Sequence, residues 1–120
     1  IDYGGVTALM TADLGFDAET ALLAETDPRL LGADILKVGH HGSKYSTSDE
    51  FLAAVAPDFA IIQCGRNTFG HPTREALEKL LANDIIVQRN DLDGAVMFNI
   101  KGGRISGYGT CGKTECVTRL

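Results

Sequence analysis

Residues 34–43 read Asp-Ile-Leu-Lys-Val-Gly-His-His-Gly-Ser, and this stretch decides how the rest of the chain is interpreted. Its apolar residues Ile35, Leu36 and Val38 predict a short buried strand. The strand ends at a glycine, and two of the three histidines of the protein follow it directly. In α/β proteins ligands collect outside the carboxyl ends of strands. The stretch therefore predicts a functional loop at a sheet edge. The rest of the chain is expected to form the scaffold that holds this loop.

Length and composition limit what kind of protein this is. The chain has 120 residues, enough for one small domain, and its 44% hydrophobic content is ordinary for a soluble globular protein. No apolar run approaches the roughly 20 residues that a membrane helix needs. The chain begins without Met, inside an expected sheet, so we expect a fragment of a longer protein.

The chain carries a net charge of -5. Domains that hold a polyanion by bulk electrostatics usually have a basic face, so this charge argues against that class of protein. If the substrate contains phosphate, a metal ion must supply the positive charge.

The residues before the central stretch predict a hairpin. Segments 1–3 and 6–11 are strand-like, and Gly4-Gly5 between them supplies the positive φ angles of a tight two-residue turn. The second of these strands runs into Asp13. A carboxylate is therefore expected at the carboxyl end of that strand.

Helices and strands alternate through the rest of the chain. Three helices are expected. The first covers 17–24, with Asp17 as its capping residue, and the second begins at Ser48 and ends at Pro57. The third follows Thr73 and has Ala76, Leu77, Leu80 and Leu81 on one face. Further strands are expected at 59–64, 85–88, 95–100 and 105–108, with a turn at 91–94. This alternation predicts an α/β layered fold with a mixed β-sheet and helices packed on it.

Polar side chains follow three of these strands: Asp13, the adjacent pair His40 and His41, and His71. On this topology they can converge on one edge of the sheet. A carboxylate with imidazoles suits zinc or manganese better than calcium or magnesium, which prefer oxygen ligands. Such a metal makes hydroxide available near neutral pH, so the pattern favours hydrolysis.

Two neighbouring residues extend this hypothesis, and a simpler reading stays open. Gly42 lets the backbone approach a metal closely, and Ser43 can hydrogen-bond a phosphate or carbonyl oxygen. Alternatively, Asp13 forms a turn or cap and the histidines make ordinary hydrogen bonds. The chain would then be a non-catalytic α/β binding module.

The three cysteines carry different expectations. Cys64 lies in an apolar run and is expected to be a small core residue. Cys111 and Cys116 lie in a tail rich in Gly and Thr, where a disulfide and free thiols both remain open.

Several segments together resemble a known family. They are 11–13 (Thr-Ala-Asp), 33–43 (Ala-Asp-Ile-Leu-Lys-Val-Gly-His-His-Gly-Ser), 46–48 (Ser-Thr-Ser), 51–57 (Phe-Leu-Ala-Ala-Val-Ala-Pro) and 67–72 (Asn-Thr-Phe-Gly-His-Pro). Their order and spacing resemble the C-terminal half of the metallo-β-lactamase-fold hydrolase domain in the ComEC family of competence DNA-uptake proteins. The resemblance covers about residues 1–100. It implies half of an αββα sandwich at 1–108, followed by a Gly/Thr/Cys tail at 109–120.

The resemblance implies roles for individual residues. Asp13 would bridge two zinc or manganese ions. One of His40 and His41 would be a metal ligand, with His40 favoured because it comes first off the strand, and the other would contact the substrate's phosphate. Ser43 and His71 would line the substrate site, and His71 would contact phosphate or transfer a proton. His41, Ser43 and His71 are thus the expected catalytic residues, and Asp13 and His40 the expected metal ligands.

The resemblance also implies a function. The chain would be part of a phosphodiesterase or nuclease that acts in DNA uptake, within a larger membrane protein at the extracytoplasmic face of the bacterial membrane. The superfamily's His-x-His-x-Asp-His motif is absent from the chain. We therefore expect the chain to be inactive or nearly so without the N-terminal half of the same domain. Hydrolysis of another ester or phosphoester remains an alternative.

The family more often has Gly at the position of Ala12. This small change leaves the neighbouring carboxylate of Asp13 in place.

Overall fold

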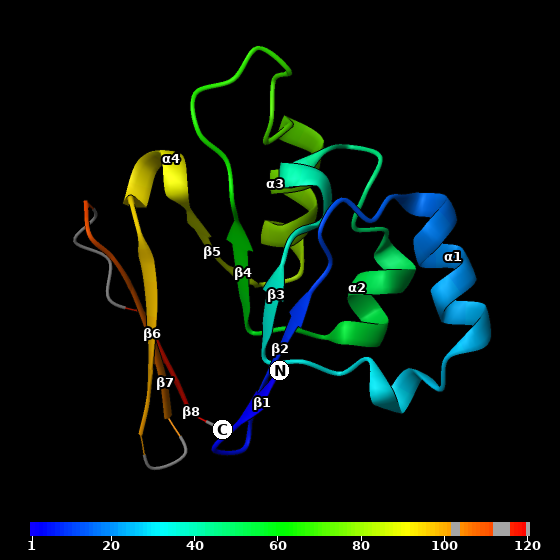
Figure 1. The fold of residues 1–120 in the computed structure, drawn as a ribbon, viewed down its shortest axis with the longest axis horizontal. Coiled ribbons are helices and arrows are strands. Elements are labelled where there is room, and N and C mark those ends of the chain that lie inside the picture. The colour runs from blue at the N-terminus through cyan, green and yellow to red at the C-terminus, as the bar shows by residue number, and fades with distance from the viewer. Residues whose placement is uncertain (102–103, 112–115, 120) are drawn as a thin grey trace.

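Strand β3 (Ile35–Lys37) is the central strand of a five-stranded sheet with the order β1-β2-β3-β4-β5 (Figure 1). The structure is a computed structural model that describes residues 1–101, 104–111 and 116–119. The other strands are β1 (Asp2–Tyr3), β2 (Val6–Met10), β4 (Phe59–Ile62) and β5 (Ile86–Arg89). β1 runs antiparallel to β2, and β2 to β5 are parallel. The predicted α/β fold with a mixed sheet is confirmed.

The first hairpin forms as predicted. Gly4 and Gly5 have φ angles of 60° and 81° and connect β1 to β2. Positive φ angles at both turn residues are what a two-residue hairpin requires. At the other end of β2 the chain continues through Thr11 towards Asp13.

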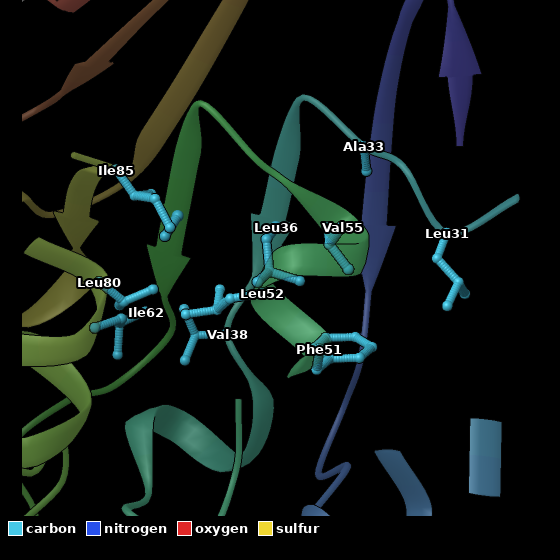
Figure 2. Packing of buried hydrophobic residues seen from close by; sticks show 11 residues of the cluster. Leu31, Ala33, Leu36, Val38, Phe51, Leu52, Val55, Ile62, Leu80 and Ile85 are labelled. Carbon is cyan, nitrogen blue, oxygen red and sulfur yellow. The ribbon is translucent and has the colours of Figure 1, made fainter. Parts of the chain in front are cut away.

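Three helices pack on one face of the sheet: α1 (Phe16–Glu25), α2 (Asp49–Val55) and α3 (Arg74–Ala82). Figure 2 shows the apolar cluster in which α2, α3 and the loop before β3 meet strands β3 and β4. Its buried members are Leu31, Ala33, Leu36, Val38, Phe51, Leu52, Val55, Ala60, Ile62, Leu80 and Ile85. Short helical turns lie at η1 (Pro28–Leu30), η2 (Gly39–Gly42) and α4 (Asn90–Asp93), the last at the predicted 91–94 turn.

The residues at which the second and third helices are predicted to begin both act as caps. The hydroxyl of Ser48 accepts a hydrogen bond from the Phe51 amide, and that of Thr73 accepts one from the Ala76 amide. The prediction of Asp17 as the cap of α1 is wrong. The N-cap is Gly15, which offers no side chain, and Asp17 already lies within the first turn.

The packed face of α3 is narrower than predicted. Ala76 and Leu80 are buried, whereas Leu81 is 62% exposed. Successive residues are about 100° apart around a helix, so a face centred on Ala76 and Leu80 turns Leu81 towards solvent. The placement of Leu81 on the packed face is therefore wrong.

A second, antiparallel sheet covers the opposite face of the central sheet (Figure 1). It contains β6 (Val96–Ile100), β7 (Arg104–Gly109) and β8 (Cys116–Arg119). The predicted final hairpin is β6 and β7. The sequence predicts no element within 109–120, but residues 116–119 pair with β7.

The two sheets meet in a second apolar cluster. Val6, Ile35 and Phe59 of the central sheet are buried with Ile105 of β7. The rings of Phe59 and Phe98 are edge-to-face, with centroids 5.4 Å apart. The strand β3 therefore has apolar contacts on both faces, which explains its near-continuous apolar run.

Candidate functional site

The loops after β2, β3 and β4 meet at the carboxyl edge of the central sheet, because these three strands are parallel. The His41 Nε2 lies 3.4 Å from the Asp13 Oδ1. The ring centroid of His40 lies 6.4 Å from that of His41 and 5.6 Å from that of His71. The structure thus brings together all four of the predicted residues that follow strands.

The ring of His41 is oriented by a second contact. Its Nδ1 lies 2.6 Å from the backbone carbonyl oxygen of Gln63, just after β4. A carbonyl oxygen can only accept a hydrogen bond, so Nδ1 carries the hydrogen and the neutral ring has its lone pair on Nε2. That lone pair faces the carboxylate of Asp13. Two electron-pair donors that face each other define a place for a cation, either a proton or a metal ion.

His71 is the partly buried histidine of the group. Burial lowers the pKa of His71 from its ordinary value, and the positive charges that His40 and His41 can carry lower it further. At neutral pH this favours an uncharged ring, which can accept a proton or bind a cation.

The backbone of the histidine loop has an unusual conformation. His40, His41 and Gly42 have φ angles of 46°, 56° and 82°, so three consecutive residues are left-handed. For residues with a Cβ this costs about 1–2 kcal/mol each. The loop is held from both sides, because the His40 amide donates to the Ala12 carbonyl and the Ser43 amide donates to the His40 carbonyl. Strain of this kind is typical of functional sites.

Ser43 lies inside the protein and is 4% exposed. Its Oγ accepts a hydrogen bond from the Tyr45 amide at 3.2 Å. The hydroxyl of Ser46 donates to the carbonyl oxygens of Gly39 and Ser43. The structure therefore places Ser43 in the turn that supports the histidines.

Sequence reasoning missed Glu19, which is buried under the same loop. Its carboxylate accepts hydrogen bonds from the amides of Thr47 and Ser48, while Lys79 Nζ donates to the Thr47 carbonyl at 2.8 Å. Thr47 is left-handed, with a φ of 58°. A helical Glu normally faces solvent, so its position in the sequence gave no signal of this role.

Sequence reasoning also missed Lys37, the buried cation of the central strand. Its Nζ donates to the Ala12 carbonyl at 2.7 Å, next to Asp13. Burial lowers the pKa of Lys37, and the negative charge of Asp13 opposes that shift. The sequence did hold a signal for this role, because a lysine stands inside an otherwise apolar strand.

Asn67 closes the loop that presents His71. Its Oδ1 accepts hydrogen bonds from the amides of Phe69 and His71, both at 3.1 Å. Its Nδ2 donates to the carbonyl oxygens of Gly65 and His71. The side chain therefore fixes the loop without help from a ligand.

A cavity of about 460 Å³ opens beside the histidines. The loop after β4 forms most of its wall. Its lining residues are His41, Gln63, Cys64, Gly65, Arg66, Asn67, Phe69, His71 and Asn90.

The side chains fit a metal ion in part. Neighbouring ligand atoms of a tetrahedral zinc ion, with bonds of about 2.1 Å, lie about 3.4 Å apart, and the Asp13–His41 contact matches this spacing. Within residues 1–101, 104–111 and 116–119, no group of three or more His, Cys, Asp and Glu side chains could hold a metal ion. The geometry thus pairs Asp13 with His41, whereas the sequence favoured His40 as the histidine ligand.

Neither Cys64 nor Cys111, the two cysteines whose side chains the structure describes, adds a ligand to this pair. Cys64 is partly buried against the apolar cluster between the helices and the central sheet, as predicted. Its Sγ lies 3.1 Å from the Asp91 Oδ1. Burial raises the pKa of its thiol. Cys111 is exposed, and its pairing with Cys116 lies outside the described side chains.

No helix in the described part of the chain is long and apolar enough to cross a bilayer.

Comparison with known proteins finds three long relatives. "ComE operon protein 3" of Bacillus subtilis (strain 168) is 37% identical over 102 residues, which are 84% of this chain and 13% of that protein. "Competence protein ComA" of Neisseria gonorrhoeae is 36% identical over 103 residues, 85% of this chain and 15% of that protein. "Recombination protein 2" of Haemophilus influenzae is 36% identical over 106 residues, 88% of this chain and 13% of that protein.

No protein-family model matches the chain. The chain spans only 13–15% of the length of these relatives. The similarity nevertheless includes most of this chain, at 36–37% identity. The chain is therefore homologous to one segment of these relatives, which are competence proteins of the ComEC family.

Proposed function

We propose that this chain forms part of a metal-dependent hydrolase site that cleaves phosphodiesters during DNA uptake. The similarity to these relatives supports the link to DNA uptake, since one is named a competence protein and another a protein of the ComE operon. The chemistry is argued from the residues at the carboxyl edge of the central sheet.

One observation carries the proposal: the Nε2 of His41 faces the Asp13 carboxylate at 3.4 Å, while the Gln63 carbonyl holds Nδ1. A backbone carbonyl that orients a ligating imidazole is a common feature of metal sites. Asp13 and His41 would hold the zinc or manganese ion. When bound, such an ion lowers the pKa of a water molecule and supplies positive charge that this acidic chain lacks.

The remaining histidines are assigned to the substrate. The ring of His40 lies against that of His71 and not against Asp13, so we assign both to the phosphate. The low pKa of His71 leaves it neutral and able to accept a proton. Ser43 would position the histidines indirectly, because its hydroxyl accepts a hydrogen bond from the Tyr45 amide within the turn that follows the histidine loop.

The other metal ligands are proposed to come from outside this chain. The relatives are several times longer, and the described residues supply only two neighbouring ligands. We assign the rest, and a second ion bridged by Asp13, to the N-terminal half of the same domain. Attachment to the extracytoplasmic face of the membrane would come through other domains of the full-length protein.

The test uses the full-length protein that contains residues 1–120. Bound zinc and manganese are measured by mass spectrometry, and hydrolysis is measured on single-stranded DNA and on bis(p-nitrophenyl) phosphate. We expect Asp13→Ala and His41→Ala to lose both metal and turnover. We expect His40→Ala to keep metal and lose turnover.

Asp58→Ala is the matched control, because Asp58 is an exposed aspartate just before β4, at the opposite end of the sheet. It should keep metal and turnover. Loss of metal in His40→Ala but not in His41→Ala would reverse the roles of the two histidines. Unchanged metal content in both Asp13→Ala and His41→Ala would contradict the site and favour the non-catalytic α/β module.

A further inference from the structure

The cavity beside His41 and His71 is lined mainly by the loop after β4, and Asp13 is not among its lining residues. We infer that this cavity binds one unpaired nucleobase of single-stranded DNA, with Phe69 as the stacking surface and Arg66 as the contact for a neighbouring phosphate. The inference rests on the proposed function, because it gives a subsite to the substrate of that hydrolase.

Phe69 has the position and exposure that base stacking requires. Its side chain lines the cavity, and the residue is 82% exposed. Its ring centroid lies 6.2 Å from that of His71, with the ring planes inclined at 36°. A base stacked on Phe69 therefore lies next to the histidine that we assign to the phosphate. Base–aromatic stacking contributes about 1–3 kcal/mol per base.

The loop is organised before any ligand binds. Both the Phe69 and the His71 amides donate to Asn67 Oδ1, and Asn67 Nδ2 donates back to two carbonyl groups of the loop. Binding therefore loses little loop entropy, which favours affinity. The amide of Asn67 is occupied by these four bonds, so it is not available to read the edge of a base. We expect little preference among the four bases.

Arg66 supplies a local positive charge in an acidic chain. It is exposed, lines the cavity, and forms no ion pair with the described residues. Arg89, by contrast, is paired with Asp91 at 2.6 Å. A single available guanidinium fits one phosphate next to a stacked base, and does not fit a long basic track along a polyanion.

The volume of the cavity agrees with this class of ligand. At about 460 Å³ it is within the range of roughly 300–1,000 Å³ of small-molecule sites. The wall combines the aromatic ring of Phe69, the thiol of Cys64 and the backbone of Gly65 with polar side chains that include Arg66 and His71. The aromatic ring suits the flat face of a base, and the guanidinium suits the phosphate next to it.

The test measures binding of fluorescein-labelled hexathymidylate by anisotropy, using the full-length protein in EDTA so that no metal-dependent cleavage occurs. Phe69→Ala should weaken binding by about 5- to 150-fold, the equivalent of about 1–3 kcal/mol. Phe69→Trp should restore it, because the larger ring stacks at least as well. Arg66→Gln should weaken binding and reduce the dependence of log Kd on log salt by about 0.7.

Tyr3→Ala is the matched control. Tyr3 is an aromatic residue of similar exposure, 70%, on β1 at the opposite end of the sheet (Figure 1). Its removal should leave binding unchanged. A hexamer of abasic sites, which keeps the phosphates and lacks the bases, should bind as weakly to the wild type as hexathymidylate binds to Phe69→Ala.

Equal affinity of wild type and Phe69→Ala for hexathymidylate would overturn the inference, as would equal affinity of the wild type for the abasic hexamer. These outcomes are independent of catalysis, because the binding is measured without metal. Phe69-dependent binding in a protein that holds no metal would support the base site and reject the hydrolase. Metal-dependent hydrolysis with Phe69-independent binding would do the reverse.

Discussion

The two ends of the central sheet use the same residue type for opposite purposes. At the amino end, Asp34 Oδ2 accepts hydrogen bonds from the amide and the hydroxyl of Thr7, at 2.6 and 2.9 Å. At the carboxyl end, Asp13 faces the Nε2 of His41, whose other ring nitrogen is already bound to a carbonyl. The first carboxylate is satisfied by donors of its own fold. The second faces another electron-pair donor and requires a cation.

The backbone shows the same difference. At the amino end, the positive φ angles of the hairpin fall on Gly4 and Gly5, which adopt them without steric cost. At the carboxyl end they fall on Ala12, His40 and His41, which carry a Cβ. The Gly4-Gly5 turn is therefore relaxed, whereas the histidine loop keeps strained residues in place through its contacts.

The largest effect is expected at Gly42, which combines a left-handed φ of 82° with close packing. A Cβ at this position would lie 2.6 Å from the Cβ of Pro72 and 3.1 Å from its Cα. Gly42→Ala should lower the free energy of unfolding by about 3 kcal/mol, from left-handed strain of about 1–2 kcal/mol and overpacking of about 1–3 kcal/mol. Urea unfolding followed by circular dichroism measures this loss.

Gly5→Ala is the matched control at the amino end. Gly5 has nearly the same φ, 81°, but no atom lies within 4 Å of the position of its Cβ. Gly5→Ala should lower the free energy of unfolding only by the left-handed strain of about 1–2 kcal/mol. Equal losses at Gly42 and Gly5 would show that the contact with Pro72 adds nothing.

The sequence predicts the scaffold well because its signals are local. The apolar run of β3, the Gly4-Gly5 turn and the Ser48 and Thr73 caps each depend on neighbouring residues, and each appears in the structure. The parallel strands then place the loops that carry Asp13 and the histidines at one edge. Convergence of the candidate site follows from that topology.

What the sequence could not predict depends on orientation in space. Glu19 occupies an ordinary position in a surface helix, but it is buried by a loop almost 30 residues away. Similarly, His40 and His41 are adjacent, and only the left-handed turn and the Gln63 carbonyl determine which ring faces Asp13. Spacing along the chain carries no information about either contact.

The next effect in size separates the two aspartates directly. Asp34→Ala leaves the partly buried Thr7 amide without its acceptor, so we expect a loss of about 2 kcal/mol in the free energy of unfolding. Asp13→Ala removes an exposed carboxylate and should change the stability of the metal-free protein by less than about 0.5 kcal/mol. Urea unfolding in EDTA measures both. A greater loss in Asp13→Ala than in Asp34→Ala would mean that Asp13 is the structural residue of the two.

The smallest expected effect is a gain in stability, at Ala12. Its φ of 47° is left-handed, and its carbonyl accepts hydrogen bonds from both Lys37 Nζ and the His40 amide, so the chain cannot relax there. Ala12→Gly removes about 1–2 kcal/mol of strain and adds about 0.4–1 kcal/mol of unfolded-state entropy, a net stabilisation of about 0.5 kcal/mol.

Ala24→Gly, on the exposed side of α1, should instead destabilise by about 0.5–1 kcal/mol. Opposite signs in parallel urea titrations would confirm that the carboxyl end stores strain, and a loss in both variants would show that the left-handed turn at Ala12 costs the fold nothing.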